Sequence, residues 1–500
     1  MPFTITQLPS GDKLCKTFDL PILDRLYDRK TIEELITTYH PKPTRARKLT
    51  MMLVIYVLIC WSLFLGSTLG AVYSELLSTE RYLGDEEPEE LPGRAAWVYR
   101  RKQVGVQILR RLFVLKCKPL ASPNTPGAFA YGLRLMSIDG TLDDVADTPA
   151  NAKYFGRHAK GKTQSPFPQV QCVYLAEAGT RAIVDAMIAP SSASEQCLAW
   201  GLLRSIEPGM LVMTDRNFVG VRFLGALVQK RGAQYLGRVP SNVFLHKQRI
   251  LKDGSYLVTF LPKDFPDLKK PLTLRIIEYT IEEKVAAQML QVTPSRAASG
   301  SLSTNPDVRK VHRIATTLLD PDLYPDHDLC VLYHERWEIE MVIDEIKDHQ
   351  RLSSQPLRSK LPVLVLQELY ALLLAHYAVC ALRLQAAETK GLDPDRVSFI
   401  ESIRVLKSGL NLSPLLTPAK TDQAIKRLYA ELVNRHRLLP PRRLRFNCRV
   451  VKRIGTRFRI KKPEHQQVKL PSSTKFADLV KTSPPQSCGS ATPPGLLETA

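Results

Sequence analysis

The pattern of apolar and polar positions predicts helices in the first quarter of the chain. From Leu49 to Ser74 no residue is charged, and this apolar stretch follows the basic residues Arg45, Arg47 and Lys48. Such a pattern would also fit a membrane span with a cytoplasmic N-terminus. Small and polar residues dilute its second half, however, and no second span follows. We therefore interpret the stretch as the buried part of a helical domain.

After residue 128 the pattern changes to short apolar strands. Residues 133–139 form the first, and residues 168–176 and 181–189 form a hairpin. Residues 209–215 form a buried strand, preceded by a helical stretch in which Glu195 has capping-box spacing from a serine. A further helix and strand follow before residue 240. The predicted order βββαβαβ is that of a mixed α/β domain.

These patterns divide the chain into regions. A helical N-terminal domain is predicted for residues 1–128 and an α/β domain for residues 129–361, with a β-rich insertion at about residues 240–322. Residues 362–462 begin with an apolar helix and continue as a helical and basic region. Residues 463–500 are rich in proline and small polar residues, which predicts a disordered tail.

Composition and charge narrow the class of protein. The 500 residues are 44% apolar and 24% charged, which is typical of globular proteins. The 70 lysines and arginines exceed the 49 acidic residues, and the formal charge of +21 favours a polyanionic partner such as nucleic acid. Nine scattered cysteines without a CxxC pair indicate reduced thiols and a cytoplasmic protein. Cys380 and His376 could share a helix face, but they lie in an apolar run that we interpret as core.

Two aspartates carry the first candidate chemistry. Asp139 and Asp215 each close a predicted apolar strand, and the strand ends of α/β sheets are where ligands and metals bind. An aspartate in this place is often a turn residue or a helix cap, so one alone would mean little. Two on successive core strands are better evidence for a site. Asp143 and Asp144 could replace Asp139 as ligands, but they lie beyond the predicted strand end.

A third ligand candidate lies on the long helix predicted after residue 325. At about 100° per residue, four polar side chains fall within a stripe about 60° wide, beside an apolar face. They are Tyr333, Arg336, Glu340 and Lys347. Three carboxylates could hold two Mg²⁺ ions about 4 Å apart for phosphoryl transfer, with Mn²⁺ as a substitute. Arg336, Tyr333 and Lys347 could then contact phosphate oxygens.

The motifs around these residues resemble those of the DDE transposases of insertion-sequence family four. The four helix residues match the family pattern Y-(2)-R-(3)-E-(6)-K without a gap. Asp139 lies in SIDGTLDDVADTPANAKYFG, which is similar to the family block DGT..DV.DT..N, and Asp215 lies in MTDRNFVG, which is similar to TDR.F. The resemblance covers about residues 130–350. It implies an RNase H-like catalytic core with a β-rich insertion.

The resemblance also implies an activity and a partner. In cut-and-paste transposition a metal-activated water nicks the element end, and the freed 3′ hydroxyl attacks the opposite strand and later the target. Asp139, Asp215 and Glu340 would hold the metal ions. Similar transposases pass through a DNA hairpin and act as a homodimer on paired terminal inverted repeats. The expected partner is therefore DNA, with no membrane, and the N-terminal domain is expected to bind DNA ends.

Other interpretations remain open at this point. A different RNase H-like nuclease would need the same three carboxylates, since these alone do not distinguish cutting from joining. A catalytically inactive DNA-binding relative is a second alternative, although the intact carboxylates argue against it. Residues 442–462 hold ten basic and no acidic residues, which predicts an arm that contacts phosphates, or else a solvated tail. The basic stretch from Arg100 to Lys118 is open to the same two interpretations.

Overall fold

A computed structural model describes residues 21–41, 49–77, 91–160, 163–218, 220–240, 243, 245–281, 311–351, 355–412, 418–441, 443 and 480–482. The fold divides into two compact units. The first contains the chain up to residue 233 together with residues 335–443, and the second contains residues 234–334 and the chain from residue 444 onward. The chain therefore leaves the first unit after residue 233 and returns to it at residue 335.

The N-terminal part of the first unit is helical, as the apolar pattern predicts. Its helices are α2 (Pro21–Asp24), α3 (Arg29–Tyr39), α4 (Met51–Trp61), α5 (Leu69–Leu76), α7 (Arg94–Val104) and α8 (Gln107–Lys116). The side chains of Asp28, Thr50 and Thr68 cap α3, α4 and α5 by accepting a backbone N–H of the first turn. Gly105, with a φ of 65°, ends α7.

The uncharged stretch that begins at residue 49 forms two short helices. α4 has 11 residues and α5 has 8, and nearly all α4 side chains are buried in the core. A membrane span needs about 20 apolar residues, so neither helix is long enough to cross a bilayer. Among the described residues, only α15 (Pro362–Glu388) has the length and composition of a span, and 89% of its most apolar window is buried inside the protein. A buried core helix explains this apolar composition.

The sheet of the first unit has the strand order β6–β5–β2–β7. The strands are β2 (Leu133–Asp144), β5 (Gln169–Glu177), β6 (Ile183–Pro190) and β7 (Met210–Thr214), with β1 (Phe129–Ala130) beside β2. β5 runs antiparallel to both β2 and β6, whereas β7 runs parallel to β2. A separate small hairpin joins β3 (Ala159–Lys160) to β4 (Thr163–Gln164). The predicted mixed α/β fold is confirmed.

Strand β2 is longer than the sequence predicts. It was expected to end on Asp139, but it continues to Asp144 because β5 pairs with it as far as Gln169. The parallel neighbour β7 stops earlier, where Thr214 lies opposite Ile138. Asp139 therefore lies inside β2, at the point where pairing with β7 ends.

Short helices connect these strands. α9 (Pro149–Phe155) follows β2, and α10 (Glu195–Leu202) with the 3₁₀ turn η1 (Leu203–Ser205) precedes β7. After β7 come the 3₁₀ turn η2 (Arg216–Phe218), α11 (Val221–Gly225) and the π-helical η3 (Ala226–Lys230). Gly232, with a φ of 69°, follows the end of η3, and glycine is the residue that most readily adopts this conformation after a helix.

The helical stretch after Pro325 is not one regular helix. It consists of α13 (Asp326–Tyr333), the 3₁₀ turn η5 (His334–Trp337), α14 (Glu338–Asp344) and the π-helical η6 (Glu345–His349). The rotation of about 100° per residue, on which the predicted polar stripe rests, applies only to α-helical residues. The angles of the predicted polar stripe are therefore not those of a regular α-helix, although Arg336 and Lys347 both contact β2. Tertiary contacts decide where each of these side chains lies.

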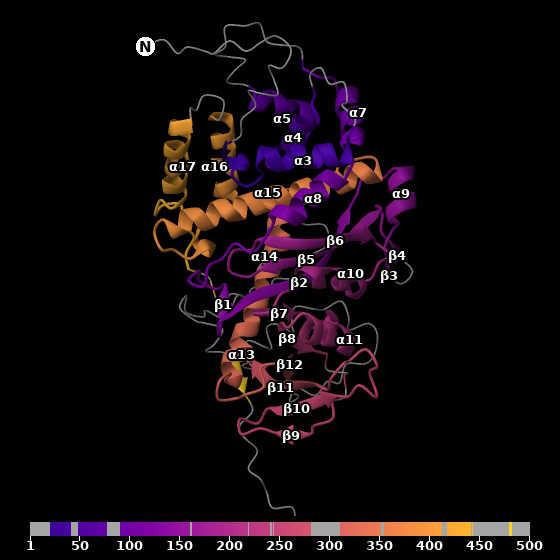
Figure 1. The fold of residues 1–500 in the computed structure, drawn as a ribbon, viewed down its shortest axis with the longest axis vertical. Helices are drawn as coiled ribbons and strands as arrows, with labels where there is room; N and C mark the ends of the chain where they lie inside the picture. Colours follow the sequence, from indigo (N-terminus) through magenta and orange to yellow (C-terminus); the bar gives the residue numbers. More distant parts are fainter. Residues whose placement is uncertain are drawn as a thin grey trace, which may run out of the picture. The chain divides into compact units, whose positions relative to one another are not determined.

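Helix α15 is the central helix of the first unit. Figure 1 shows it crossing between the N-terminal helices and β6, and it contacts α4, α8 and β6. It also packs against α16 (Phe399–Leu412) and α17 (Pro418–Leu432), and the 3₁₀ turn η7 (Pro394–Arg396) precedes α16 in the chain. His376 and Cys380 are fully buried in α15, which confirms their predicted core position.

The strands of the second unit pair in the antiparallel order β8–β12–β11–β10–β9. The strands are β8 (Gln234–Val239), β9 (Arg249–Ile250), β10 (Tyr256–Phe260), β11 (Leu272–Ile281) and β12 (His312–Thr316). β13 (Val480–Thr482) pairs with β11, so these three residues depart from the prediction of a disordered tail. Residues 294–306 of the insertion, which are rich in serine and other small residues, lie outside the described residues.

Candidate active site

The register of the sheet brings the two predicted aspartates together. In the parallel pairing of β2 with β7, Ile138 lies opposite Thr214, and the next residues along the two strands are Asp139 and Asp215. Neighbouring strands are about 4.8 Å apart, so the two carboxylates lie side by side where β7 ends. Each carboxylate also accepts a 2.8 Å hydrogen bond from a backbone N–H that follows it closely in the chain, which restrains its orientation.

Arg336 connects the third carboxylate to this pair. Its Nη2 donates to Oε1 of Glu340 at 2.9 Å, and its Nη1 lies 3.7 Å from Oδ2 of Asp139. The Arg336 side chain is only 9% exposed, whereas that of Glu340 is 36% exposed and reaches solvent. The guanidinium group of Arg336 thus lies between Asp139 and Glu340, and Asp215 lies beside Asp139 on the neighbouring strand end.

The pKa of Asp139 reflects this convergence. Burial raises the pKa of the carboxyl, and the charges of Asp215 and Glu340 raise it further, whereas the Gly140 N–H and Arg336 lower it. The net result is a pKa of about 6. The charge of Arg336 therefore does not offset the rise in the pKa of Asp139 that burial and the neighbouring carboxylates cause. The site favours additional positive charge.

A fourth carboxylate, that of Glu195, lies beside the site and is not among the predicted site residues. Glu195 is the first residue of α10, and Ser194 caps this helix instead of the serine expected from the capping-box spacing. A Cβ atom on Gly140 would collide with the Glu195 side chain, so the carboxylate lies directly against the backbone beside Asp139. Burial and the charge of Asp215 raise the pKa of Glu195. The sequence signal for this contact is the glycine that follows Asp139.

Lys347 contacts β2 beyond the first aspartate. Its Nζ donates to the carbonyl of Leu142 at 2.7 Å and lies 3.6 Å from Oδ1 of Asp143. Asp143 is 3% exposed and also accepts a 2.7 Å hydrogen bond from Arg351, while Asp144 accepts one from a glutamine of β5. These partners explain both aspartates as structural residues and argue against either as a replacement for the first ligand.

The donor set of the site suits a hard divalent cation. Carboxylate oxygens are the ligands that such cations prefer, and the side chains that supply them come from a strand, a strand end and a helix. The Arg336 guanidinium already lies between Asp139 and Glu340, where positive charge is most favourable. Carboxylates arranged in this way support metal-assisted phosphoryl transfer.

Comparison with protein families decides which class of enzyme this site serves. Residues 130–377 match the family model of the transposase DDE domain, and residues 17–114 match that of the insertion element 4 transposase N-terminal region. The chain belongs to the IS4 family of DDE transposases. The two matches cover the N-terminal helices and the sheet that carries the candidate site.

Two relatives of this IS4-family transposase come from Escherichia coli (strain K12). The transposase InsG for insertion sequence element IS4 is 28% identical over 422 residues, which cover 82% of this chain and 86% of InsG. The putative transposase InsZ is 28% identical over 141 residues, 28% of this chain and 47% of InsZ. Among solved structures, the piggyBac transposase in a synaptic complex with hairpin DNA has a TM-score of 0.41 and 11% identity over 84% of this chain and 86% of that one.

Membership of the family establishes the activity. As a DDE transposase, the protein cuts DNA and transfers DNA strands, and DNA is its partner. DDE transposases generally use divalent metal ions, in agreement with the carboxylate donor set. The predicted family and activity are therefore confirmed.

The remaining predicted phosphate contacts of the transposase are Tyr333 and the basic segment 442–462. Tyr333 is the last residue of α13 in the second unit and is 8% exposed. The basic segment 442–462 lies outside the described residues except for Arg443, which pairs with Glu335 at 2.7 Å and with Asp393 at 2.8 Å. The described part of this segment thus has a structural ion pair.

The basic residues of α7 also include structural ones. Arg101 is 4% exposed and donates hydrogen bonds to Gln367, to Ser359 and to the carbonyl of Leu364. These bonds fasten α7 to the start of α15. In this transposase Arg101 therefore stabilises the fold and does not offer its charge to DNA.

Proposed function

We propose that Asp139, Asp215 and Glu340 bind two Mg²⁺ ions and catalyse both the cutting and the joining of DNA, with Mn²⁺ able to replace Mg²⁺. One observation carries the proposal: Arg336 bridges two of these carboxylates while the third raises the pKa of Asp139 from close by. When bound, the ions would activate the attacking oxygen and stabilise the leaving oxygen of an in-line displacement. The protein contributes carboxylates held by rigid strands and a helix.

The signature residues beside the carboxylates would bind the DNA backbone. In the DNA-free protein the Arg336 guanidinium is paired with Glu340 and lies near Asp139. A guanidinium can donate two parallel hydrogen bonds to a phosphate, so Arg336 would exchange these carboxylates for the scissile phosphate once cations neutralise them. Tyr333 and Lys347 are proposed to contact further phosphate oxygens.

The DNA partners follow from the proposed chemistry. We infer that the protein acts on the terminal inverted repeats of its element and on target DNA, as a homodimer in the synaptic complex and in the cytoplasm. The helical domain of residues 1–128 would bind the DNA ends, and residues 129–361 would form the catalytic domain. Residues 362–462 would support this domain and add basic contacts.

An end-joining assay tests this proposal. Purified protein incubated with Mg²⁺ and the DNA ends that flank its own gene is expected to produce nicked ends, followed by products joined to a target plasmid. Both products should disappear when EDTA replaces Mg²⁺ and should reappear with Mn²⁺. Cut but unjoined DNA under all conditions would indicate an RNase H-like nuclease, and intact DNA would indicate an inactive DNA-binding relative.

Arg336→Gln is expected to separate metal binding from catalysis. The substitution removes the cation that competes for Asp139 and Glu340, so the affinity of the DNA-free protein for Mn²⁺ should rise by about threefold to tenfold, because such a pair is worth on the order of 1 kcal/mol. End cleavage should nevertheless slow, since a phosphate contact is lost. Titration of Mn²⁺ followed by electron paramagnetic resonance measures the affinity.

Arg351→Gln is the matched control for this titration. Arg351 donates to Asp143, which is not a proposed ligand, at 2.7 Å, close to the 2.9 Å between Arg336 and Glu340. Its substitution should leave the Mn²⁺ affinity unchanged. Loss of bound Mn²⁺ in Arg336→Gln would contradict the role of Arg336 in phosphate binding.

A further inference from the structure

Arg181 is a buried arginine in the turn between β5 and β6. Its side chain is 2% exposed, and its backbone has a φ of 62°, in the left-handed region that side chains other than glycine rarely adopt. Strained backbone of this kind persists only where the surrounding contacts hold it in place. The contacts of the guanidinium group supply that restraint.

Each nitrogen of this guanidinium has an acidic partner. Nε donates to Oε2 of Glu338 at 2.6 Å, Nη1 donates to Oε1 of Glu345 at 2.8 Å, and Nη2 pairs with Oδ1 of Asp395. Glu338 belongs to α14, Glu345 to η6 and Asp395 to η7. The Arg181 side chain, from the turn between β5 and β6, therefore bonds to three separate helical segments.

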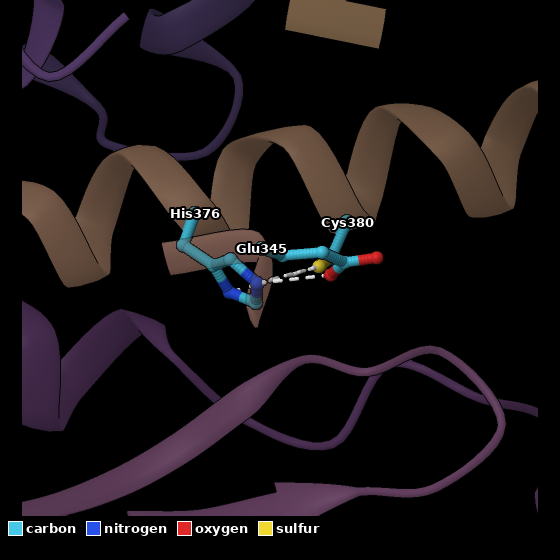
Figure 2. Close-up of side chains that lie close together, drawn as sticks. All are labelled: Glu345, His376 and Cys380. Carbon is cyan, nitrogen blue, oxygen red and sulfur yellow. Dashed lines mark hydrogen bonds and ion pairs between the residues drawn. The ribbon is translucent and has the colours of Figure 1, made fainter. Parts of the chain in front are cut away.

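Glu345 is the second centre of this ion cluster. Its Oε1 also accepts a hydrogen bond from Arg383 at 3.2 Å, and its Oε2 lies 3.3 Å from Nε2 of His376. Figure 2 shows His376 and Cys380 on α15 facing Glu345, with the Cys380 sulfur 3.8 Å from the imidazole nitrogens. Burial alone would raise the pKa of Glu345, but Arg383, Arg181 and His376 lower it below its usual range. The carboxylate therefore stays ionised inside the core.

Charge balance favours an ion cluster over a metal site at Glu345, His376 and Cys380. Potential ligand atoms of these three residues lie within 4.8 Å of one another. Burial alone would lower the pKa of His376, but Cys380 and Glu345 raise it to about 9, so the imidazole is protonated at neutral pH. A divalent cation here would also lie beside the guanidinium groups of Arg181 and Arg383, which already neutralise the carboxylate.

The cluster holds the catalytic helix on both sides of Glu340. Glu338 precedes Glu340 by two residues and Glu345 follows it by five, and both are bonded to Arg181. Arg181 belongs to the β5–β6 connection, and β5 pairs along its length with β2, where Tyr174 lies opposite Asp139. The same guanidinium therefore ties the helix of the third carboxylate to the strands that hold the first.

We propose that Arg181 is a positioning residue of the transposase, which sets the place of Glu340 relative to Asp139 and thereby the affinity of the site for its metal ions. This inference rests on the proposed function, because it takes Glu340 to be a metal ligand. Because Arg181 is buried and paired with three carboxylates, it would act through the helix of Glu340 and not by contact with DNA or metal. Groups that orient metal ligands typically change metal affinity by about 10- to 100-fold when they are removed.

Substitution of Arg181 by methionine tests this role through the Mg²⁺ dependence of end nicking. Arg181→Met is expected to raise the Mg²⁺ concentration for half-maximal nicking by about tenfold or more. The rate at saturating Mg²⁺ should recover most of the wild-type value, and binding of end DNA should not change. Arg181→Lys keeps a positive charge and should have a smaller effect. Assays at a temperature well below the melting transition of every variant keep unfolding out of the comparison.

Arg204→Met is the matched control. Arg204 also forms a two-point ion pair with a buried aspartate of the same sheet, Asp185, at 2.6 and 2.9 Å, and its ion pairs among the described residues do not include the catalytic helix. This variant should lower the melting temperature and leave the Mg²⁺ dependence as in the wild type. An equal Mg²⁺ dependence in Arg181→Met and Arg204→Met would overturn the proposal.

A milder variant keeps the test decisive if Arg181→Met does not fold. Glu338→Gln keeps the size of the side chain and removes the charge from one of the three pairs, so it should raise the half-maximal Mg²⁺ concentration several-fold. A wild-type Mg²⁺ dependence in this variant would overturn the positioning role. Glu340→Gln in the same assay tests the underlying proposal separately, since retained nicking there would contradict Glu340 as a ligand whatever the Arg181 variants do.

Discussion

Asp139→Asn is expected to abolish end cleavage while the protein still binds end DNA. The amide keeps the shape of the side chain but removes the charge that we propose holds a metal ion beside Asp215. Metal ions contribute several kcal/mol of charge stabilisation in the transition state, and each 1.4 kcal/mol or so is a factor of ten in rate. The cleavage rate should therefore fall by about three orders of magnitude or more. Single-turnover cleavage and gel-shift assays of the same preparation measure the two properties.

Asp215→Asn and Glu340→Gln should reproduce this separation of binding from cleavage. Asp144→Asn is the matched control, because Asp144 lies on the same strand as Asp139 and an asparagine oxygen can still accept the hydrogen bond from Gln169. Its cleavage rate should stay close to that of the wild type. Substantial cleavage by any of the three ligand variants would refute the assignment of that residue.

Glu345→Gln is expected to cause the largest loss of stability among single substitutions in the ion cluster. Glu345 is 2% exposed, so its partners are buried with it. The substitution removes the carboxylate that pairs with the guanidinium groups of Arg181 and Arg383 and with the protonated His376. Breaking a buried ion pair by removing one partner costs about 3–5 kcal/mol. Denaturant unfolding should show this decrease in the free energy of unfolding.

Glu431→Gln provides the comparison at the surface. Glu431 also pairs with two arginines, Arg404 at 2.7 Å and Arg437 at 2.9 Å, but its side chain is 37% exposed. Exposed pairs are worth about 0–1 kcal/mol, so this variant should unfold almost as the wild type does. Equal losses in the two variants would show that burial does not strengthen the Glu345 cluster.

Local patterns of the sequence predicted most elements of the fold correctly. The β5–β6 hairpin, the buried strand β7 and the apolar helix α15 lie close to where periodicity placed them. Strands β10 to β12 lie within the predicted β-rich insertion. The end of a strand is not predictable from the apolar pattern where a partner strand extends it. β2 extends past Asp139 because β5 pairs with residues 140–144, and the polar residues of this extension carry no apolar signal of a strand.

The helix of the signature motif shows a second limit. Its spacing identified Arg336 and Glu340 correctly as neighbours, since residues four apart meet within one turn. It did not predict the 3₁₀ turn η5 or the π-helical η6, because a change of hydrogen-bonding pattern depends on what packs against the helix. Lys347 lies at Leu142 and Asp143 of β2, a contact that the spacing of the motif alone does not specify.

The sequence by itself determined the family, the motif residues and the order of the elements, because residue chemistry and periodicity are properties of the linear chain. Only the tertiary structure decided the contacts between distant residues. The parallel register of β2 and β7 sets Asp139 beside Asp215. Glu195 lies against Gly140, and Arg181 bonds to Glu338 across 157 residues of chain. The sequence does not name the partners of such contacts, since the two residues lie far apart in the chain and each alone is an ordinary residue. These contacts are strong because they are buried: water is excluded, and an unpaired charge would be costly there.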